Sequence, residues 1–420
     1  IYLSLNATFQ SSVTKPIAYR KRQLYNLARF AQENAEALAQ CLFEDLGKPR
    51  QEALCTEINP VVQRALHAAQ NLDKWMDHET GRFEVQPFQK NWKVQVEKCP
   101  KGVSLIIVPW NYPVILAFLP LIGAIAAGCC SAIKLSEMAP AVASFIAENL
   151  TKHLDANAYR VILGGVPEIT KVLELKWDHI LYTGNSKTAR IIAAAAARHL
   201  TPLTLELGGK SPVIIDASST DLEVVARRVL WGKVMNAGQI CVSPDYVLLV
   251  GGGDVEAKFV TAMKKVYAEF YPQGALAYEG MGDGGYGRIV NKTHFERIRG
   301  MMEASQGRVV VRGKVDEERL MIEPCVIVVD QAGKDVLLEE EIFGPILPVV
   351  IVGSVDAAIK FVNERPHALT LYLFTETDRF RKTVIDHTMS GQVVVNDTVF
   401  HLTCGCFFDN LCSFLRSVSG

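Results

Sequence analysis

Two short segments after residue 200 combine a carboxylate, a thiol and several glycines. Glu206 ends an apolar, strand-like stretch within TPLTLELGGK, and Cys241 follows a turn-like Asn-Ala-Gly-Gln run. Burial at such a strand end raises the pKa of a carboxyl group, which can then accept a proton near neutral pH. A cysteine thiolate is a nucleophile when the fold brings a base and an oxyanion-binding group close to it. Glu206 and Cys241 are therefore candidates for nucleophilic catalysis.

A third candidate lies upstream, in the run PWNYP. It places the Asn111 amide in a rigid turn between Pro109 and Pro113. Asparagine commonly does no more than hold such a turn. In an active site its N–H group would bind an oxyanion, which contributes typically a few kcal/mol, or roughly 10²–10³ in rate. The neighbouring Tyr112 either lines a substrate tunnel or packs in the core.

Each candidate also has a purely structural interpretation. A lone cysteine such as Cys241 is more often a small buried hydrophobic residue. Glu206 alone would be a surface carboxylate. The neighbouring segments favour the chemical interpretation of both.

Composition narrows the classes of partner. The chain has 420 residues, enough for two or three domains with cores of their own. Lys and Arg total 44 and Asp and Glu total 45, so the net charge is -1. Nucleic-acid-binding proteins usually carry a basic stripe, and this balance gives no reason to expect one. The ten cysteines lack zinc-ribbon spacing. We expect no metal site, no disulfide scaffold and a reducing compartment such as the cytoplasm.

The elements that position these residues follow from periodicity. Helical spacing predicts long helices over residues 19–46 and 50–76, and the alternating WKVQVEK predicts an exposed two-stranded ribbon within residues 83–101. Strands then alternate with helices, as in a doubly wound sheet. The predicted strands span residues 103–107, 132–135, 158–163, 179–182, 203–205, 212–216, 245–250, 308–311, 325–329 and 392–396. The predicted helices between them include residues 222–234, 255–270 and 354–365.

One uncharged stretch, between Lys101 and Lys134, is long enough to cross a bilayer. It contains three prolines and three glycines, which divide it into a strand, a helix over residues 114–127 and a second strand. Continuous apolar strands separated by a helix are typical of a parallel sheet covered on both faces. We therefore interpret the stretch as buried core.

Taken together and in this order, PWNYP, TPLTLELGGK and NAGQIC resemble the aldehyde dehydrogenase superfamily. The runs YTGN and RHLTPLTLELGGKSP resemble its class 3 branch, which acts on fatty and aromatic aldehydes. The resemblance covers roughly residues 18–398 and implies an α/β fold with a Rossmann-type cofactor domain, an α/β catalytic domain and a small β-ribbon for oligomerisation. The implied boundaries are 1–82 and 102–209 for the NAD-binding domain, 210–395 for the catalytic domain, and 83–101 with 396–420 for the ribbon and tail.

The resemblance also implies a mechanism. The Cys241 thiolate attacks the aldehyde carbon to give a thiohemiacetal, hydride leaves for the nicotinamide, and the resulting thioester is hydrolysed. Glu206 is the general base, with Glu341 the next candidate, and the Asn111 side chain donates to the oxyanion beside the Cys241 backbone N–H. Tyr112 would line the tunnel for the aldehyde.

A cofactor set follows from the same resemblance. NAD is expected and NADP is an alternative, because a carboxylate such as Glu137 binds ribose hydroxyls and repels a 2′-phosphate. A strand-to-helix turn would hold the pyrophosphate at a helix N-terminus. The implied cofactor residues are Lys134, Glu137, Thr183, Gly184, Asn185, Glu341 and Phe343. Leu135 and Ala189 depart from the family pattern, which has proline and glycine there.

The C-terminus departs further. After VVVND, at residues 393–397, relatives continue to a PFGG-type loop and a strand that bridges subunits, whereas this chain reads HLTCGCFFDNLCSFLRSVSG. We expect a truncated or misread product, or else a divergent tail. The tail would form a helix that packs over the core or contacts a membrane. Its apolar face would consist of Phe407, Leu411, Phe414, Leu415 and Val418. Without the bridging strand the ribbon would have an unpaired edge, and we expect a poorly active, poorly dimeric chain.

The sequence thus predicts an NAD(P)-dependent aldehyde dehydrogenase, cytoplasmic or in contact with a membrane, that forms a family-like homodimer where the tail permits. Two alternatives remain. One is a catalytically impaired NAD-binding relative that acts as a scaffold or partner subunit. The weaker one is a cysteine hydrolase, for which no histidine motif near Cys241 supplies a partner.

Overall fold

The computed structural model describes residues 1–77, 79–80, 86–89, 91–92, 95–278, 285–329, 334–403 and 415–419. The chain forms two compact units. Unit 1 comprises Ile1–Cys41, Ala53–Glu206 and Phe408–Gly420, and unit 2 comprises Leu42–Glu52 and Leu207–Phe407. The chain thus passes from unit 1 to unit 2 directly after Glu206, a few residues before the boundary expected at 209.

The core of unit 1 is a five-stranded sheet. Across the sheet, its strands are β5 (Tyr159–Ile162), β4 (Cys130–Lys134), β3 (Val103–Ile107), β6 (His179–Gly184) and β7 (Leu203–Leu207). Neighbours from β5 to β6 pair in parallel. Strand order reverses between β3 and β6, as in doubly wound folds that bind ligands beyond the carboxyl ends of the strands at this point. The predicted α/β fold is confirmed.

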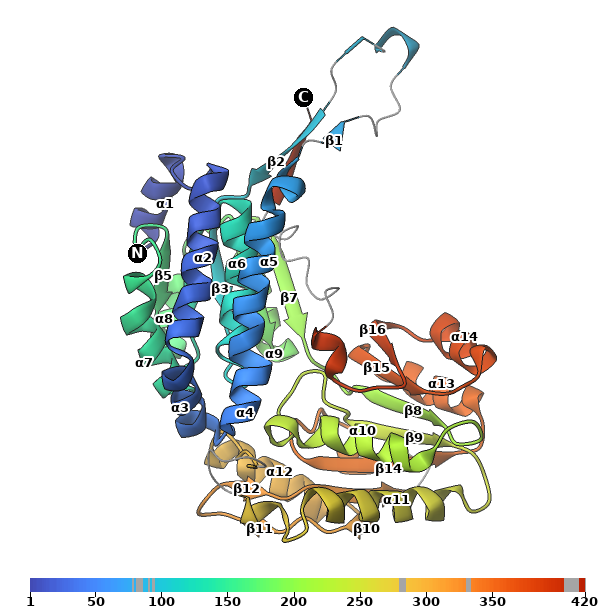
Figure 1. Cartoon of the computed structure of the whole chain (residues 1–420). Helices are drawn as coiled ribbons and strands as arrows, with labels where there is room; N and C mark the ends of the chain where they lie inside the picture. Colours follow the sequence, from blue (N-terminus) through green and yellow to red (C-terminus); the bar gives the residue numbers. More distant parts are fainter. Residues whose placement is uncertain are drawn as a thin grey trace. The chain divides into compact units, whose positions relative to one another are not determined.

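Helices pack around this sheet. Those within unit 1 are α1 (Tyr2–Gln10), α2 (Ile17–Glu33), α5 (Asn59–Met76), α6 (Ile115–Ala127), α7 (Pro140–Asn149), α8 (Val166–Val172) and α9 (Ser186–Ala197), whereas α3 (Ala35–Leu46) and α4 (Arg50–Ala53) each belong partly to unit 2. Figure 1 shows α2, α5 and α6 packed side by side. The helix predicted over residues 19–46 is two helices, because Asn34 leaves the helical conformation with φ -108° and ψ 17°.

The uncharged stretch forms β3, α6 and β4, as predicted. All five residues of β3 and of β4 are buried, and α6 ends at Gly128, whose φ of 90° suits a residue without a side chain. Among the described residues, no helix is both long and apolar enough to cross a membrane.

The core of unit 2 is a seven-stranded sheet. Across the sheet, its strands are β10 (Arg308–Val311), β13 (Cys325–Val329), β14 (Ile346–Val352), β9 (Tyr246–Val250), β8 (Pro212–Asp216), β15 (Ala368–Phe374) and β16 (Ser390–Val395). Strand β10 pairs antiparallel with β13, and the other neighbours pair in parallel. A separate hairpin joins β11 (Val315–Asp316) and β12 (Met321–Ile322).

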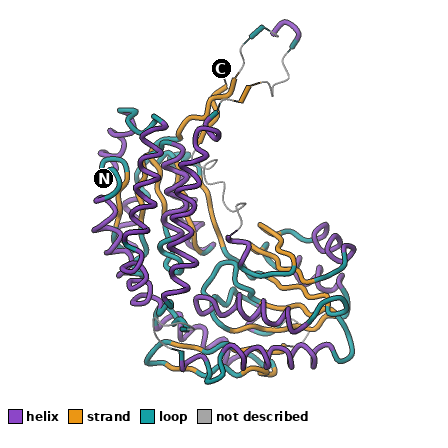
Figure 2. The backbone as a smooth tube through the Cα atoms, in the orientation of Figure 1, coloured by secondary structure: helices purple, strands orange, loops and turns teal. Residues whose placement is uncertain are grey.

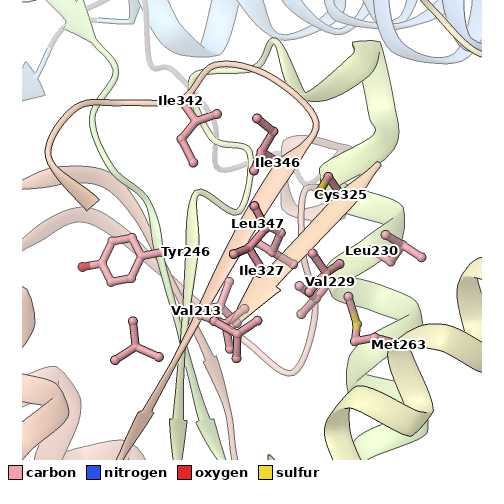
Figure 3. Close-up of a cluster of buried hydrophobic side chains, with 14 of the residues drawn as sticks. Val213, Val229, Leu230, Tyr246, Met263, Cys325, Ile327, Ile342, Ile346 and Leu347 are labelled. Carbon is pink, nitrogen blue, oxygen red and sulfur yellow. The ribbon is translucent and has the colours of Figure 1, made fainter. Parts of the chain in front are cut away.

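Helices pack on this sheet as well. They are α10 (Leu222–Val234), α11 (Val255–Phe270), α12 (Lys292–Ala304), α13 (Val355–Asn363) and α14 (Asp378–His387). In Figure 3, Val229 of α10 and Met263 of α11 lie beside strand residues such as Ile327. The tube in Figure 2 shows the same alternation of strands and helices in each unit.

A third, small sheet corrects the predicted ribbon and tail. Strand β2 (Gln95–Pro100) pairs antiparallel with β1 (Glu79–Thr80) on one side and with β17 (Leu415–Ser419) on the other. The expectation of a two-stranded ribbon with an unpaired edge is therefore wrong. So is the helix expected at Leu415 and Val418, because pairing with β2 holds both in a strand. Phe407, Leu411 and Phe414 lie outside the described residues, as do residues 83–85, 90 and 93–94 of the ribbon.

Candidate active site

The carboxyl ends of β3, β4 and β6 carry most of the residues predicted in unit 1. Asn111 follows β3, Lys134 ends β4, and Thr183 and Gly184 end β6. Because these strands are neighbours and parallel, the residues share one edge of the sheet, where strand order reverses. The structure thus brings the predicted cofactor residues of unit 1 to one edge.

Lys134 and Glu137 form an ion pair at this edge. The Lys134 ammonium lies 3.0 Å from Glu137 Oε2 and donates to the Leu135 carbonyl oxygen at 2.6 Å. The lysine side chain is 5% exposed and the glutamate 50% exposed. The lysine is therefore anchored inside the sheet edge, while the carboxylate remains available to solvent and to a polar ligand.

The turn after β6 leads directly into α9. The Asn185 side chain accepts a hydrogen bond from Thr188 N at 2.9 Å, which caps the helix. A side chain at Gly184 would collide with Tyr182, because an added Cβ would lie 2.2 Å from the hydroxyl oxygen. The glycine thus lets the Tyr182 hydroxyl approach the turn that precedes α9, and the N-terminus of such a helix is a position where phosphate groups bind.

The connection from β3 to α6, residues 108–114, is the Asn111 turn. Val108 N donates to the Lys134 carbonyl oxygen at 3.0 Å, which fixes the start of the turn on β4. Asn111 is 4% exposed and Tyr112 is 7% exposed. The structure therefore gives the Asn111 amide a buried and restricted position.

Glu206 lies near the end of β7 and is half-buried. Burial raises the pKa of its carboxyl group, as the sequence predicted for an acid at an apolar strand end. A carboxyl group of this kind holds its proton more tightly than a surface glutamate and is a better base once ionised. Glu206 therefore has the protonation behaviour that a general base requires.

The Cys241 turn, residues 235–243, belongs to unit 2 and follows α10. Its backbone is unusual, because Asn236 and Ala237 have φ values of 49° and 51°. Such left-handed conformations cost non-glycine residues roughly 1–2 kcal/mol. Next comes Gly238, with φ 77°, where a side chain would collide with the Gly344 carbonyl oxygen. The turn thus packs backbone to backbone against the EIFGP segment.

Side chains hold this turn in place. Buried Gln239 donates from Nε2 to the carbonyl oxygens of Asn236 at 2.9 Å and Arg288 at 3.0 Å, and its Oε1 accepts from Val290 N at 3.0 Å. Asn236 N donates to Glu52 Oε1 at 2.8 Å. Neither Gln239 nor Glu52 was assigned a role from the sequence. Gln239 was visible within NAGQIC, whereas no local signal connects Glu52 to this turn.

The far side of the Cys241 turn contacts β15. The buried Tyr372 hydroxyl donates to the Val242 carbonyl oxygen at 2.5 Å, and burial raises the pKa of Tyr372 far above its ordinary value, which keeps the hydroxyl protonated.

Cys241 itself is half-buried. By contrast, burial raises the pKa of Cys129 to about 11 and that of Cys130 to about 12, so both thiols stay protonated and unreactive.

The start of the tail packs on α10. Phe400 stacks on Trp231 with 4.8 Å between ring centroids, and the Thr398 hydroxyl donates to the Arg228 carbonyl oxygen at 2.6 Å. A side chain at Gly232 would collide with Thr398. Residues after 397 therefore continue the packed structure of unit 2 through the described 3₁₀ turn that ends at 403.

Glu341 lies against the glycines that follow Glu206. Its Oε1 accepts a hydrogen bond from Gly209 N at 3.2 Å, and an added Cβ at Gly208 would lie 2.6 Å from the same oxygen. Burial raises the pKa of Glu341 to about 7, and the nearby Asp245 carboxylate acts in the same direction, against the lowering effect of Lys210 and Lys233. Phe343 follows with a φ of 49°.

Asp245 connects the segment after Glu206, which carries Lys210, with the segment that carries Glu341 and Ile342. It forms an ion pair with Lys210 at 2.5 Å and accepts from Ile342 N at 3.1 Å. Lys233 is fully buried, its ammonium has no hydrogen-bond partner among the described residues, and burial lowers its pKa to about 8. Sequence reasoning missed this charged cluster, because its members are far apart in the chain and follow no motif.

The residues of unit 1 fit a dinucleotide. The edge offers a buried lysine paired with an accessible carboxylate, and the N-terminus of a twelve-residue helix, which is a favourable position for a phosphate group. Cys241, Glu341 and Phe343 belong to unit 2, whereas Asn111 and Glu206 belong to unit 1. Each unit therefore carries its own share of the predicted catalytic residues.

Comparisons with known proteins agree with this assignment. Residues 5–407 match the aldehyde dehydrogenase family. The chain is 39% identical over 402 residues to aldehyde dehydrogenase family 3 member I1, chloroplastic, of Arabidopsis thaliana, covering 95% of this chain and 71% of that protein. It is also 39% identical to the dimeric NADP-preferring aldehyde dehydrogenase of Canis lupus familiaris, covering 94% of this chain and 85% of that protein.

A solved structure is similar throughout. The substrate-bound state of Staphylococcus aureus AldH superposes with a TM-score of 0.93 at 35% identity, covering 100% of this chain and 92% of that one. Neither the family match nor these relatives support the scaffold or hydrolase alternatives. On the strength of the doubly wound edge, the Cys241 turn and these matches, the chain belongs to the aldehyde dehydrogenase family.

Proposed function

We propose that Cys241, Glu206 and Asn111 carry out the reaction of this NAD(P)-dependent aldehyde dehydrogenase. The Cys241 sulfur bonds to the aldehyde carbon, and the carbonyl oxygen becomes an oxyanion that accepts a hydrogen bond from the Asn111 amide. Preorganised donors of this kind contribute typically about 10²–10³ in rate. When bound, NAD(P)⁺ accepts the hydride that leaves this carbon, and a thioester on Cys241 remains.

Glu206 completes the cycle in this proposal. Its carboxylate takes a proton from the attacking water, whose oxygen bonds to the thioester carbon while the carbon–sulfur bond breaks and the carboxylic acid leaves. The raised pKa of Glu206 supports this role, because a base is most effective when its pKa approaches the working pH. Glu341, whose pKa is about 7, is the second candidate for the base.

The observation that carries the proposal is the Cys241 turn. Two left-handed residues, a buried glutamine and the Tyr372 hydroxyl hold a half-buried cysteine in one fixed backbone conformation. Strained backbone that the surroundings hold in place is typical of functional sites. The buried Cys129 and Cys130 have no comparable setting and high pKa values.

For the cofactor, we propose that Lys134 and Glu137 hold the adenosine ribose and that Thr183, Gly184 and Asn185 hold the pyrophosphate. Glu341 would bind the nicotinamide ribose, with Phe343 near the ring. Since Glu137 is half exposed and negative, it would favour NAD over NADP, although the relative from Canis lupus familiaris is NADP-preferring.

Substrate, assembly and location are proposed more broadly. The resemblance to the class 3 branch suggests medium- or long-chain aliphatic or aromatic aldehydes, with Tyr112 lining their path. The dimeric relative supports a homodimer. No disulfide bond links the described cysteines, which supports a reducing compartment such as the cytoplasm. Membrane contact through the tail stays an alternative.

A wild-type assay tests the proposal. The purified chain is mixed with an aliphatic or aromatic aldehyde in the presence and absence of NAD⁺, and NADH and the carboxylic acid are quantified. We expect equal amounts of both products, and none without NAD⁺. Dinucleotide binding without turnover would favour the scaffold alternative, and ester cleavage without any aldehyde oxidation would favour the hydrolase.

A further inference from the structure

A buried carboxylate sits directly behind the Asn111 turn. Glu57 lies in η1 (Leu54–Ile58), a π-helical turn between α4 and α5, and is 0% exposed. Its Oε2 accepts hydrogen bonds from Val114 N at 2.9 Å and from Ile115 N at 3.3 Å. These N–H groups mark the point where the Asn111 turn becomes α6, so one carboxylate oxygen holds the junction.

The physical chemistry of this junction makes it stiff. The first N–H groups of a helix have no partners within the helix, and Val114 at the N-cap makes no side-chain cap. Hydrogen bonds to a charged acceptor are roughly twice as strong as neutral ones, and negative charge is favourable at this helix end. A buried carboxylate without such partners would be costly, so Glu57 and the start of α6 hold each other in place.

The turn is consequently fixed at both ends. Val108 N is bonded to the Lys134 carbonyl oxygen at the β3 end, and Glu57 holds the α6 end. Between these points Pro109 and Pro113 restrict the backbone. Asn111 lies between these two anchored ends and is 4% exposed. The π-helical turn supports a specific role, because π-turns interrupt helices often at functional sites.

We propose that Glu57 is a positioning residue for the oxyanion donor. Through the start of α6 it sets the direction of the Asn111 amide, without contacting the substrate itself. This inference rests on the proposed role of Asn111. It predicts that Glu57 affects the chemical step more than substrate or cofactor binding.

The competing explanation is that Glu57 only stabilises the fold, and unit 2 provides a matched control. Glu323 is 2% exposed and also accepts two backbone hydrogen bonds, from Leu276 N at 3.1 Å and Lys314 N at 3.0 Å. Its loops carry none of the proposed catalytic residues. Glu57→Gln and Glu323→Gln each keep the size of the side chain and remove one buried charge.

The test compares these two variants with Asn111→Ala and with the double variant Asn111→Ala/Glu57→Gln. Urea denaturation should show comparable stability losses for the two glutamine variants. Of the two glutamine variants, only Glu57→Gln should lower kcat, by about tenfold. This loss is smaller than the roughly 10²–10³-fold that one oxyanion donor contributes, because the donor remains present. The KM for aldehyde and the Kd for NAD should stay near wild type. In the Asn111→Ala background, Glu57→Gln should lower kcat no further.

Three results would overturn the inference. A wild-type kcat for Glu57→Gln would leave only a structural role, and an equal loss of kcat in both backgrounds would show that Glu57 acts independently of Asn111. If Asn111→Ala alone kept wild-type turnover, the proposed oxyanion role and this inference would both fall. Should Glu57→Gln not fold, Glu57→Asp keeps the charge but shortens the reach, and a wild-type kcat for it would contradict the inference.

Discussion

The Asn111 turn and the Cys241 turn present reactive groups by opposite means. In unit 1, two prolines and hydrogen bonds at both ends restrict residues 108–114, none of which has a left-handed backbone. In unit 2, the Cys241 turn includes two left-handed residues that Gln239, Glu52 and Tyr372 hold in place. The prolines thus restrict the Asn111 turn by covalent stiffness, whereas the surrounding side chains hold the Cys241 turn in a strained conformation.

This difference fits the proposed roles. An oxyanion donor needs only a constant direction, which prolines supply at little cost in entropy. A nucleophile also needs its sulfur and its own backbone N–H to face the reacting carbon. The left-handed Asn236 and Ala237 follow α10 directly and lead the chain into the segment that carries Cys241. Variants that remove the reactive groups, or relax one turn, test the comparison.

The largest effect is expected at the nucleophile. Cys241→Ala should lower kcat by about 10⁴-fold or more, since removing a covalent nucleophile leaves only binding and electrostatic contributions. NAD binding, followed by the quenching of protein fluorescence, should stay near normal. Cys325→Ala is the control, because this thiol is buried within β13 and burial raises its pKa. Near-wild-type turnover of Cys241→Ala would remove the covalent mechanism.

The next largest effect is expected at the base. Glu206→Gln should lower kcat by about 10²–10⁴-fold, because the amide cannot accept a proton from the water that attacks the thioester. The rate of the wild type should rise with pH through the raised pKa of Glu206, and this rise should vanish in the variant. If the rate at neutral pH did not change, the base would be Glu341 instead.

Glu341 should make stability depend on pH. Its pKa is about 7 in the folded state against 4.5 for an ordinary glutamate, so the folded state binds the proton more tightly. The resulting stabilisation is complete below about pH 4.5 and is lost as the pH rises through 7, with a slope of at most about 1.4 kcal/mol per pH unit. In urea titrations from pH 5 to 8, Glu341→Gln should lose less stability than the wild type. If the wild type and Glu341→Gln lost stability equally over this pH range, the raised pKa of Glu341 would be contradicted.

The smallest effects should distinguish the two turns. Ala237→Gly relieves a left-handed alanine and should stabilise the fold by about 1 kcal/mol, while lowering kcat a few-fold because the turn loosens. Pro113→Ala also loosens its turn, but it removes a restriction on the unfolded chain rather than a strain, so it should destabilise the fold by roughly 0.5–1 kcal/mol. Thermal melting measures the change in stability, and steady-state kinetics measures the change in kcat. Stabilisation by both changes would show that the turns do not differ as described.

Much of this fold could be predicted from the sequence alone. The strands Val103–Ile107 and Pro212–Asp216 and the helix Leu222–Val234 have the bounds that were predicted, because apolar runs between turn residues give a clear local signal. Strand β17 was predicted as a helix. Leu415 and Val418 are spaced as on a helical face, and only pairing with the distant β2 determines their conformation.

The candidate site likewise contains residues with a local sequence signal and residues that only the structure reveals. Cys241, Glu206 and Asn111 stand within short recognisable runs, and the raised pKa of Glu206 followed from its place on an apolar strand. Glu57, Glu52 and Asp245 stand in no motif. Each acts on backbone N–H groups or a lysine far away in the chain, and only the folded structure brings those partners together. Local patterns therefore point to the proposed reacting groups, whereas the residues that hold their segments in place appear only with the fold.

The most direct test of the proposed mechanism is to trap the acyl-enzyme. Glu206→Gln is mixed with NAD⁺ and an aromatic aldehyde, quenched in acid during the first turnover, digested and analysed by mass spectrometry. Because hydrolysis of the thioester is slowed, we expect a burst of NADH close to one per active site and an acyl group on the peptide that contains Cys241. A burst with no acylated peptide, or an acyl group on another cysteine, would contradict the assignment of Cys241 as the nucleophile.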